Sequence, residues 1–373
     1  MERRSAETFV RAVFESAGVR VGGTARHDLQ VYDRRFYARV LAEGNLGMGE
    51  TYMDGLWDSP AVDEMLFRLI RSGLYDRARV GARGRLLLLR ARLFNLQSLR
   101  RAFEVGERHY DVGNDLFEAM LDARMTYSCG YWRNVRTLDE AQCAKLDLVC
   151  RKIGLKPGRR ALDLGCGWGS FARYAAEVYG AEVTGVTVSR AQAAWAAERC
   201  RGLPVEIRLG DYREVSGSYD AVVSIGMLEH VGPKNYRTYM QVTDRCLAPH
   251  GVALIQTICS NQISCYLDAW MNRYIFPNGV LPALEQLERA MRGRFVLEDV
   301  HNFGPDYDRT LMAWYGNLRG VWSRLGSRYD ERFRRMWTYY LLSCAATFRA
   351  RYNQLVQLVM TQIGTPQPNC RHG

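Results

Sequence analysis

A glycine-rich stretch in the middle of the chain has the spacing of a turn that binds a nucleotide. Asp163 stands two residues before Gly165, and Gly167 and Gly169 follow at alternate positions. Glycine permits positive φ angles and lets a ligand lie against the backbone, while the helix expected after the turn offers free N–H groups. We therefore expect this stretch to bind a cofactor that contains a nucleotide.

The residues after this turn distinguish two kinds of nucleotide cofactor. A dinucleotide enzyme prefers an acidic residue about 20 residues on, where it holds the ribose. This chain has Thr187–Ser189 there, followed by Gln192. The Gly-x-Gly-x-Gly spacing after Asp163 is also more typical of S-adenosylmethionine-dependent methyltransferases than of nicotinamide enzymes. Further on, Asp211 and Tyr212 can supply a carboxylate for the adenine amino group and a ring that stacks on it. The sequence therefore predicts methyl transfer from S-adenosylmethionine.

These residues need a frame that holds the ends of several strands together. From Arg160 onward, short apolar segments alternate with helical ones, which is the pattern of a parallel sheet with crossover helices. The sequence therefore predicts an α/β fold for this part. Strands are expected at 160–165, 182–188, 205–209, 221–225, 251–258 and 355–362, and helices at 169–178, 190–200, 235–247 and 332–351.

Two domains are expected in a chain of 373 residues, because one domain usually has roughly 100–200. We predict a small α+β domain at 1–76, a basic amphipathic linker at 77–105 and a catalytic domain at 106–373. The linker contains eight arginines around the apolar run 86–89. Two interpretations stay open: a solvated helix that connects the domains, or a segment whose arginines meet phosphates while its leucines touch acyl chains.

The composition limits the classes of protein and of partner. Hydrophobic residues make up 47% and charged residues 24%, which excludes the disordered and collagen-like classes. The net charge of +11 favours polyanions, whether nucleic acid, an anionic membrane or acidic small molecules. No apolar run reaches the roughly 18 residues of a membrane span, and no signal peptide is evident, so we expect a cytoplasmic protein. The cysteines and histidines lack zinc spacing, so free thiols and no metal are expected.

Longer motifs are spread over nearly the whole chain. They are found at 44–55, 107–115, 127–132, 165–169, 185–189, 227–232, 274–279, 301–307 and 311–315. Those from 107 onward closely resemble the catalytic domain of cyclopropane-fatty-acyl-phospholipid synthases and mycolic acid cyclopropane synthases. The segment 44–55 resembles the non-catalytic domain of the bacterial enzymes of this family that act on phospholipids.

The resemblance implies a Rossmann-like class I methyltransferase fold, with a mostly parallel seven-stranded sheet and a small N-terminal α+β domain that interacts with lipid. It implies that the methyl group of S-adenosylmethionine goes to the cis double bond of unsaturated acyl chains in membrane phospholipids. The carbocation that results loses a proton as a cyclopropane ring closes. A homodimer that associates peripherally with the inner face of the membrane is implied as well.

The same resemblance implies a bound bicarbonate that removes this proton. Its ligands would be Cys129, Glu229, Tyr315 and the backbone of Ile258, together with the residue at position 256. The family's usual His-Thr-Ile has its histidine at this last position, whereas this chain has Gln256. Glutamine offers only neutral hydrogen bonds, and charge-assisted ones are roughly twice as strong. Three interpretations stay open: slower cyclopropanation, a repacked anion site, or a methyl-branched or methylene product.

The cofactor contacts that the resemblance implies follow the same motifs. Tyr127 and Ser128 would lie at the methionine end, and Gly165 and Gly167 against the backbone of the ligand. Thr187 and Gln192 would lie at the ribose. The adenine would lie near three consecutive residues, Asp211, Tyr212 and Arg213.

Other functions remain to be distinguished. The cofactor loop would equally serve a methyltransferase for soluble small molecules, but this would leave the basic amphipathic linker unexplained. A lipid-binding protein without activity is suggested by Gln256, and the retained Cys129, Glu229 and Tyr315 argue against it. A nucleic-acid methyltransferase fits the net charge, but the sequence has no nucleic-acid-binding module, so we expect no nucleic-acid partner.

Overall fold

The computed structural model describes residues 2–73, 113–264 and 267–372. The chain forms two compact units, of which the first comprises residues 1–94, 266–277 and 311–353. The second comprises residues 95–265, 278–310 and 354–373. The predicted linker at 77–105 lies outside the described residues, as do positions 107–112 of the motif at 107–115. The domain boundaries that we placed around this linker stay predictions.

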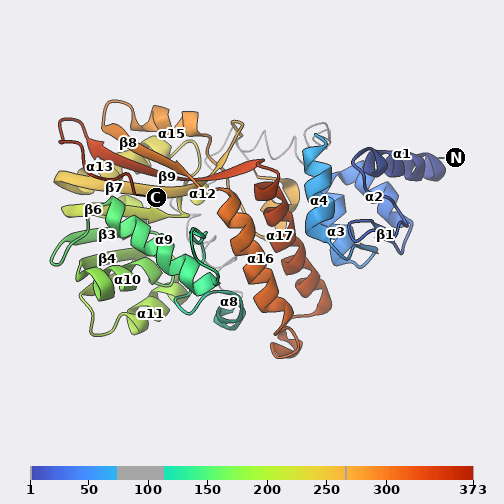
Figure 1. Cartoon of the computed structure of the whole chain (residues 1–373), viewed down its shortest axis with the longest axis horizontal. Coiled ribbons are helices and arrows are strands. Elements are labelled where there is room, and N and C mark those ends of the chain that lie inside the picture. The colour runs from blue at the N-terminus through green and yellow to red at the C-terminus, as the bar shows by residue number, and fades with distance from the viewer. Residues whose placement is uncertain (1, 74–112, 265–266, 373) are drawn as a thin grey trace. The chain divides into compact units, whose positions relative to one another are not determined.

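The second unit is built on one seven-stranded sheet (Figure 1). Its order is β5-β4-β3-β6-β7-β9-β8. The strands are β3 (Arg160–Leu164), β4 (Glu182–Thr187), β5 (Val205–Leu209), β6 (Tyr219–Ile225), β7 (Leu247–Ser260), β8 (Phe295–Asn302) and β9 (Asn353–Gln362). The pairs from β5 to β7 are parallel, and β8 pairs antiparallel with β9. The predicted α/β fold with a mostly parallel sheet is confirmed.

Helices cover both faces of this sheet. They are α8 (Asn114–Met120), α9 (Leu138–Lys152), α10 (Ser170–Tyr179), α11 (Arg190–Arg199), α12 (Leu228–Val231), α13 (Tyr236–Cys246), α15 (Leu284–Met291) and the start of α16 (Pro305–Arg319). Leu162 and Leu164 of β3 pack with residues of α13 and α15, whereas Ala161 packs with residues of α9 and α10. Because successive strand residues face opposite sides, β3 is buried on both faces after its exposed first residue, and Asp163 is a polar residue within this buried part.

The first unit is mostly helical. Its elements are α1 (Glu2–Ser16), β1 (Gln30–Val31), α2 (Arg35–Glu43), α3 (Asn45–Met53), β2 (Trp57–Asp58), α4 (Val62–Arg71), α14 (Ala269–Tyr274), the end of α16 and α17 (Glu331–Arg349). The two short strands pair antiparallel. A Cβ atom at Gly49 would collide with the ring of Trp270, so the glycines of α3 allow a close approach between helices.

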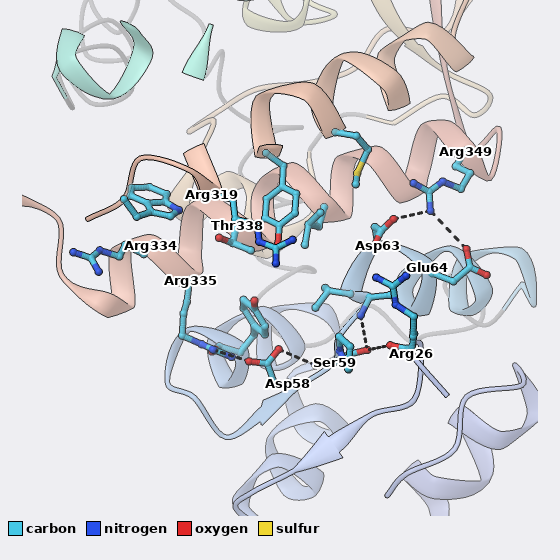
Figure 2. Close-up of a pocket in the computed structure, with 18 of the residues that line it drawn as sticks. Arg26, Asp58, Ser59, Asp63, Glu64, Arg319, Arg334, Arg335, Thr338 and Arg349 are labelled. Carbon is cyan, nitrogen blue, oxygen red and sulfur yellow. Dashed lines mark hydrogen bonds and ion pairs between the residues drawn. The ribbon is translucent and has the colours of Figure 1, made fainter. Parts of the chain in front are cut away.

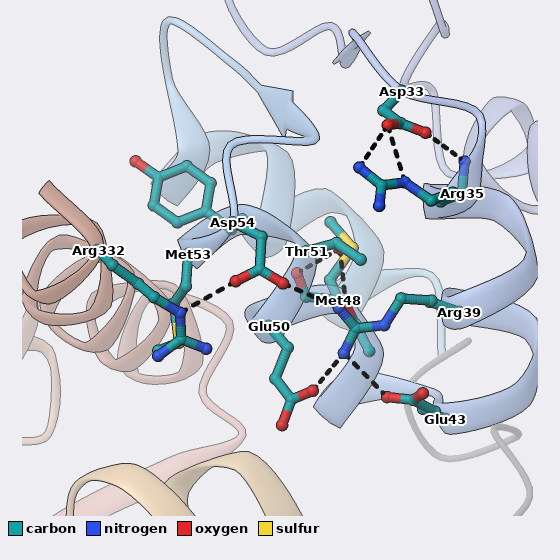
Figure 3. A network of polar contacts seen from close by, with 12 residues as sticks. Asp33, Arg35, Arg39, Glu43, Met48, Glu50, Thr51, Met53, Asp54 and Arg332 are labelled. Atoms are coloured by element: carbon teal, nitrogen blue, oxygen red, sulfur yellow. Dashed lines mark hydrogen bonds and ion pairs between the residues drawn. The ribbon is translucent and has the colours of Figure 1, made fainter.

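Arginines join the helices of the first unit (Figure 3). Arg39 of α2 forms ion pairs with Glu43, Glu50 and Asp54, and Asp54 also pairs with Arg332 of α17 at 3.0 Å. These contacts link α2, α3 and α17 through a single charged network.

A second arginine ties the start of the chain to α17. Arg335 donates to the carbonyl oxygen of Trp57 at 2.9 Å and pairs with Asp58 at the same distance. Its guanidinium also lies over the ring of Tyr52, 4.0 Å from the centroid. In the part of the chain that the structure describes, no helix has both the length and the apolar character to cross a membrane.

Candidate active site

The glycine-rich turn joins the end of β3 to the start of α10. Gly165, Gly167 and Gly169 have φ angles of 86°, 54° and 81°, which side chains of L-residues rarely adopt. A Cβ atom at Gly165 would meet the Sδ atom of Met227 at 3.1 Å, whereas one at Gly167 would meet no atom within 4 Å. Among the described residues, the space at the Cβ position of Gly167 is therefore open, as a ligand lying against this backbone would require.

The end of β4 adjoins this turn. The amide of Gly165 donates to the carbonyl oxygen of Val186 at 2.9 Å, so the two strand ends are held together. Thr187 donates its hydroxyl to Oε1 of Gln192 at 2.9 Å, and Ser189 caps α11 by accepting from the amide of Gln192. Thr187 and Gln192, both predicted to lie at the ribose, therefore contact each other. The side-chain nitrogen of Gln192, Nε2, is left to donate a hydrogen bond.

The predicted adenine residues form a compact cluster after β5. Asp211 accepts from the backbone amide of Arg213 at 2.9 Å and from its guanidinium at 2.8 Å. That guanidinium also lies over the ring of Tyr212, which packs against Tyr239 with ring centroids 5.0 Å apart. Each oxygen of Asp211 thus has one partner already, and each retains a lone pair for a further donor.

The segment that contains Tyr127 and Ser128 lies against the same turn. The Tyr127 ring contacts the rings of Phe117 and Trp168, with centroids 5.3 and 6.4 Å away. Gln142 of α9 donates to the carbonyl oxygen of Ser128 at 2.7 Å and fixes the backbone there. The structure thereby joins the motif at 127–132 to Trp168 of the glycine-rich turn.

A buried lysine that sequence analysis missed lies between these parts. Lys145 of α9 is fully buried and donates to the hydroxyl of Ser128 at 2.9 Å. Burial lowers the pKa of Lys145 to about 8, and the carboxylates of Asp122 and Asp163 oppose this shift. Burial also raises the pKa of Asp163 to about 7, which Lys145 opposes.

Asp163 has an unsatisfied oxygen. Its Oδ2 atom is buried and has no hydrogen-bond partner among the described residues. A buried polar atom without a partner is costly, and a ligand with an amine or hydroxyl donor would supply one. Together with the open space at Gly167, this atom fits a polar cofactor on the glycine-rich turn.

Glu229 lies in α12, directly after the strand next to β3. Its Oε1 atom accepts from the backbone amide of Ile258 at 2.7 Å, and its Oε2 atom is buried without a partner in the described part of the chain. Burial raises the pKa of Glu229 to about 7, although the bond from Ile258 opposes the shift. The structure therefore brings these two predicted anion ligands together, and the Ile258 amide donates to Glu229.

Gln256 lies two residues before Ile258 on β7, so their side chains share one face of the strand. Gln256 is almost fully buried, and its Oε1 atom accepts from the amide nitrogen of Gln357 of β9 at 3.0 Å. Gln357 was not predicted. Because it occupies the oxygen of Gln256, the amide nitrogen of Gln256 is the group left to donate.

Cys129 is a buried thiol in the motif at 127–132. Its Sγ atom donates to the carbonyl oxygen of Gly130 at 3.1 Å and lies 3.9 Å from the hydroxyl of Thr310. Burial raises the pKa of Cys129 well above its ordinary value, so the residue is a neutral thiol. Thr310 also accepts from the indole of Trp132 at 2.9 Å and fixes this segment.

Tyr315 is the one predicted catalytic residue that belongs to the first unit. It lies on α16, where it lines a cavity together with Tyr52. Its part in binding an anion stays a prediction. No group of three residues that could hold a metal ion is found among the residues that the structure describes.

Comparison with known proteins gives the chain a family context. Residues 97–358 match the family described as mycolic acid cyclopropane synthetase. The chain is 50% identical over 346 residues to the cyclopropane-fatty-acyl-phospholipid synthase of Escherichia coli (strain K12), which covers 93% of this chain and 91% of that protein. It is 32% identical over 353 residues to the tuberculostearic acid methyltransferase UfaA1 of Mycobacterium tuberculosis (strain ATCC 25618 / H37Rv), with 88% and 81% covered.

A solved structure has a similar fold over part of this chain. The mycolic acid cyclopropane synthase CmaA1, complexed with SAH and CTAB, superposes with a TM-score of 0.65 at 31% sequence identity. The superposition covers 70% of this chain and 98% of that one. The likeness therefore extends from sequence to fold.

Proposed function

The chain belongs to the mycolic acid cyclopropane synthetase family of S-adenosylmethionine-dependent methyltransferases, and we propose that it converts unsaturated acyl chains of phospholipids into cyclopropane chains. The proposed reaction transfers a methyl group to a cis double bond and then removes a proton from the new methyl as the ring closes. The observation that carries this proposal is the buried carboxyl group of Glu229, held at the edge of the sheet that also bears the glycine-rich turn.

S-adenosylmethionine, when bound, supplies the activated methyl group. The open space at Gly167, the unpaired oxygen of Asp163 and the pair formed by Thr187 and Gln192 fit such a ligand. Ser128, which is proposed to contact the methionine end of the cofactor, would be held rigidly. Its hydroxyl accepts from Lys145, and its carbonyl oxygen accepts from Gln142. Fixed polar groups that need no rearrangement lower the barrier to transfer.

The second half of the reaction needs a base beside the new methyl, and we assign it to bicarbonate. Glu229, with a pKa raised to about 7, is partly protonated at neutral pH and can donate through Oε2. Gln256 can donate through its amide nitrogen. Cys129 has one S–H, which the carbonyl oxygen of Gly130 accepts, so it can donate to the anion only after its thiol turns away from that oxygen. The anion would therefore be held by neutral donors, with weaker hydrogen bonds than a charged histidine would supply, which favours the interpretation of slower cyclopropanation.

The product distinguishes this proposal from its alternatives. A relative named a tuberculostearic acid methyltransferase leaves a methyl-branched or methylene product open. The purified protein is incubated with S-adenosylmethionine and unsaturated phospholipid vesicles, with and without added bicarbonate. The released fatty acids are then identified by mass and by proton NMR, since a methylene chain shares the mass of a cyclopropane chain.

A cyclopropane product whose yield rises with bicarbonate is expected. Glu229→Leu serves as the matched control, because it keeps roughly the volume of the side chain and removes the group that donates to the anion, and it should form little or no cyclopropane. A methyl-branched or methylene product would contradict ring closure. If soluble amines or alcohols are methylated and phospholipids are not, the enzyme acts on small molecules instead.

A further inference from the structure

The first unit contains a cavity of about 730 Å³ whose wall includes the predicted anion ligand Tyr315, and the reaction described above assigns no role to the other residues of this wall (Figure 2). Its walls come from the segment after β2, from α4, from the end of α16 and from α17. Cavities of this size hold small ligands or head groups. Tyr315, which belongs to the motif at 311–315, is part of the wall.

Nearly half of the lining residues are charged, and the arginines outnumber the carboxylates by one. Most of the carboxylates in the wall already form an ion pair with an arginine. Asp58 pairs with Arg335 at 2.9 Å, and Asp63 pairs with Arg349 at 2.8 Å, as Figure 2 shows. Glu64 pairs with Arg68 at 3.0 Å. These pairs neutralise one another and leave the remaining cations of the wall to act on a ligand.

Two arginines of the cavity wall form no ion pair with the described residues. Neither Arg26 nor Arg319 has an ion pair or a side-chain hydrogen bond with any other described residue, and both side chains are exposed. The hydroxyl groups of Tyr315 and Thr338 also have no hydrogen-bond partner within the described ranges. The cavity therefore presents two guanidinium groups and two hydroxyl groups that are free to donate.

Free guanidinium groups next to hydroxyl donors match a phosphate group better than a neutral ligand. A guanidinium offers a planar pair of donors that fits two phosphate oxygens, and charge-assisted bonds of this kind are strong. Met312, Trp322 and Leu342 supply an apolar part of the same wall. A ligand that combines a phosphate with a glycerol or acyl portion would use both parts.

We propose that this cavity binds the phosphodiester head group of the phospholipid substrate, with Arg26 and Arg319 as the phosphate ligands. The inference rests on the proposed function, since it assumes a phospholipid substrate. It assigns the first unit a part in recognising the substrate. The methyl-transfer chemistry stays with the second unit.

Kinetics with two lipid substrates test this assignment. Arg26→Gln, Arg319→Gln and the double variant are compared with Arg324→Gln, whose arginine is exposed in the same unit but does not line the cavity. Each substrate has the same unsaturated acyl chains, but one is a phospholipid and the other a diacylglycerol in neutral vesicles. Thermal unfolding verifies that every variant is folded.

The KM for phospholipid should rise roughly tenfold in each single variant, because a lost charge-assisted bond has about that effect. The kcat, the KM for S-adenosylmethionine and the KM for diacylglycerol should not change, and Arg324→Gln should behave as the unaltered protein. An equal rise for diacylglycerol, or an equal rise in Arg324→Gln, would overturn the proposal.

Direct binding separates a head group from free phosphate and is independent of catalysis. Titration calorimetry should detect binding of a glycerophosphodiester without acyl chains to the whole protein, and its loss in the double variant. If inorganic phosphate binds as tightly and the phospholipid KM is unaltered in the variants, the cavity takes free phosphate and the head-group assignment fails. If the protein methylates no lipid at all, the proposed function fails, while this titration still decides whether the cavity binds the phosphodiester.

Discussion

Burial controls the charge of several groups in the second unit. Three groups are buried: Lys145, Asp163 and Glu229. Burial lowers the pKa of the lysine and raises the pKa of the two carboxyl groups, so in each case it favours the neutral form of the side chain. Groups with a pKa near 7 or 8 exchange protons readily at neutral pH, which is why such values gather at functional sites. The structure thus places the groups most easily titrated around the glycine-rich turn and the end of β7.

The shift at Glu229 predicts how stability depends on pH. Its pKa is about 7 in the folded protein against an ordinary 4.5, so the folded state binds more protons within this window. The stability that protonated Glu229 contributes is therefore lost as the pH rises from about 4.5 through about 7. Glu229→Gln should be more stable than the unaltered protein above pH 7, by about 2–3 kcal/mol.

Urea unfolding of both proteins between pH 5 and 8 measures this difference. The gap should widen with pH and level off above the folded pKa. Glu182→Gln, at an exposed position at the start of β4, is the control and should produce no such widening. A gap of constant size at every pH would contradict the shift.

The sequence could name candidate residues of the site, but not the partners that these residues have in the fold. The motifs identified Glu229, Ile258 and Gln256, and the structure brings Glu229 and Ile258 together. Lys145 was missed because a lysine in a helix is normally expected in solvent. It is buried because Ser128 and Asp163 approach it from other parts of the chain, and no local pattern records such a meeting.

Among the elements, the strands of the parallel sheet were predicted to within a few residues. β3, β4, β6 and β7 are largely buried and read as mostly apolar runs between turn signals, whereas the edge strand β5 is partly exposed and alternates apolar and charged residues. β8 was missed because its pattern is inverted: Val296 and Leu297 are exposed, whereas Glu298 is buried and accepts from Thr361 at 2.7 Å. It also lies at the edge of the sheet and has an irregular register. Neither alternation nor a continuous apolar run marks such a strand.

The glycine-rich turn makes a prediction at the scale of one element. Gly167→Ala should lower the affinity for S-adenosylmethionine roughly tenfold or more, because a methyl group there would enter the space proposed for the ligand. Gly158→Ala is a matched control, since Gly158 also has a positive φ angle and an open Cβ position, but precedes β3.

Both variants should lose about 1–2 kcal/mol of stability, the usual cost of a positive φ angle for alanine. Binding of S-adenosylmethionine is measured by calorimetry, and stability by thermal unfolding. Equal losses of affinity in the two variants would mean that backbone strain, and not the ligand space at Gly167, explains the effect.

For the whole molecule, net charge predicts attachment to membranes. With +11 at pH 7, the protein should sediment with anionic phospholipid vesicles at low salt and much less with neutral ones. Binding should weaken as salt rises toward 1 M, where the screening length falls to about 3 Å. Sedimentation that is insensitive to both salt and lipid charge would contradict electrostatic attachment.

The arrangement of the whole molecule was the hardest feature to predict from sequence. A boundary inferred from composition divides a chain into consecutive pieces, whereas the first unit contains three separate segments. Residues 311–353 belong with the N-terminal helices because α17 packs against α3 and α4. Arg335 and Arg349 anchor that packing through Asp58 and Asp63.

This packing has a consequence for synthesis on the ribosome. Trp57 is made 278 residues before Arg335, the side chain that binds its carbonyl oxygen. The N-terminal helices therefore emerge with an apolar face that α14 and α17, both synthesised much later, cover in the folded protein. During translation this apolar face stays exposed to solvent and accessible to chaperones until α17 is synthesised. A chain truncated before α17 would therefore leave the first unit incompletely folded.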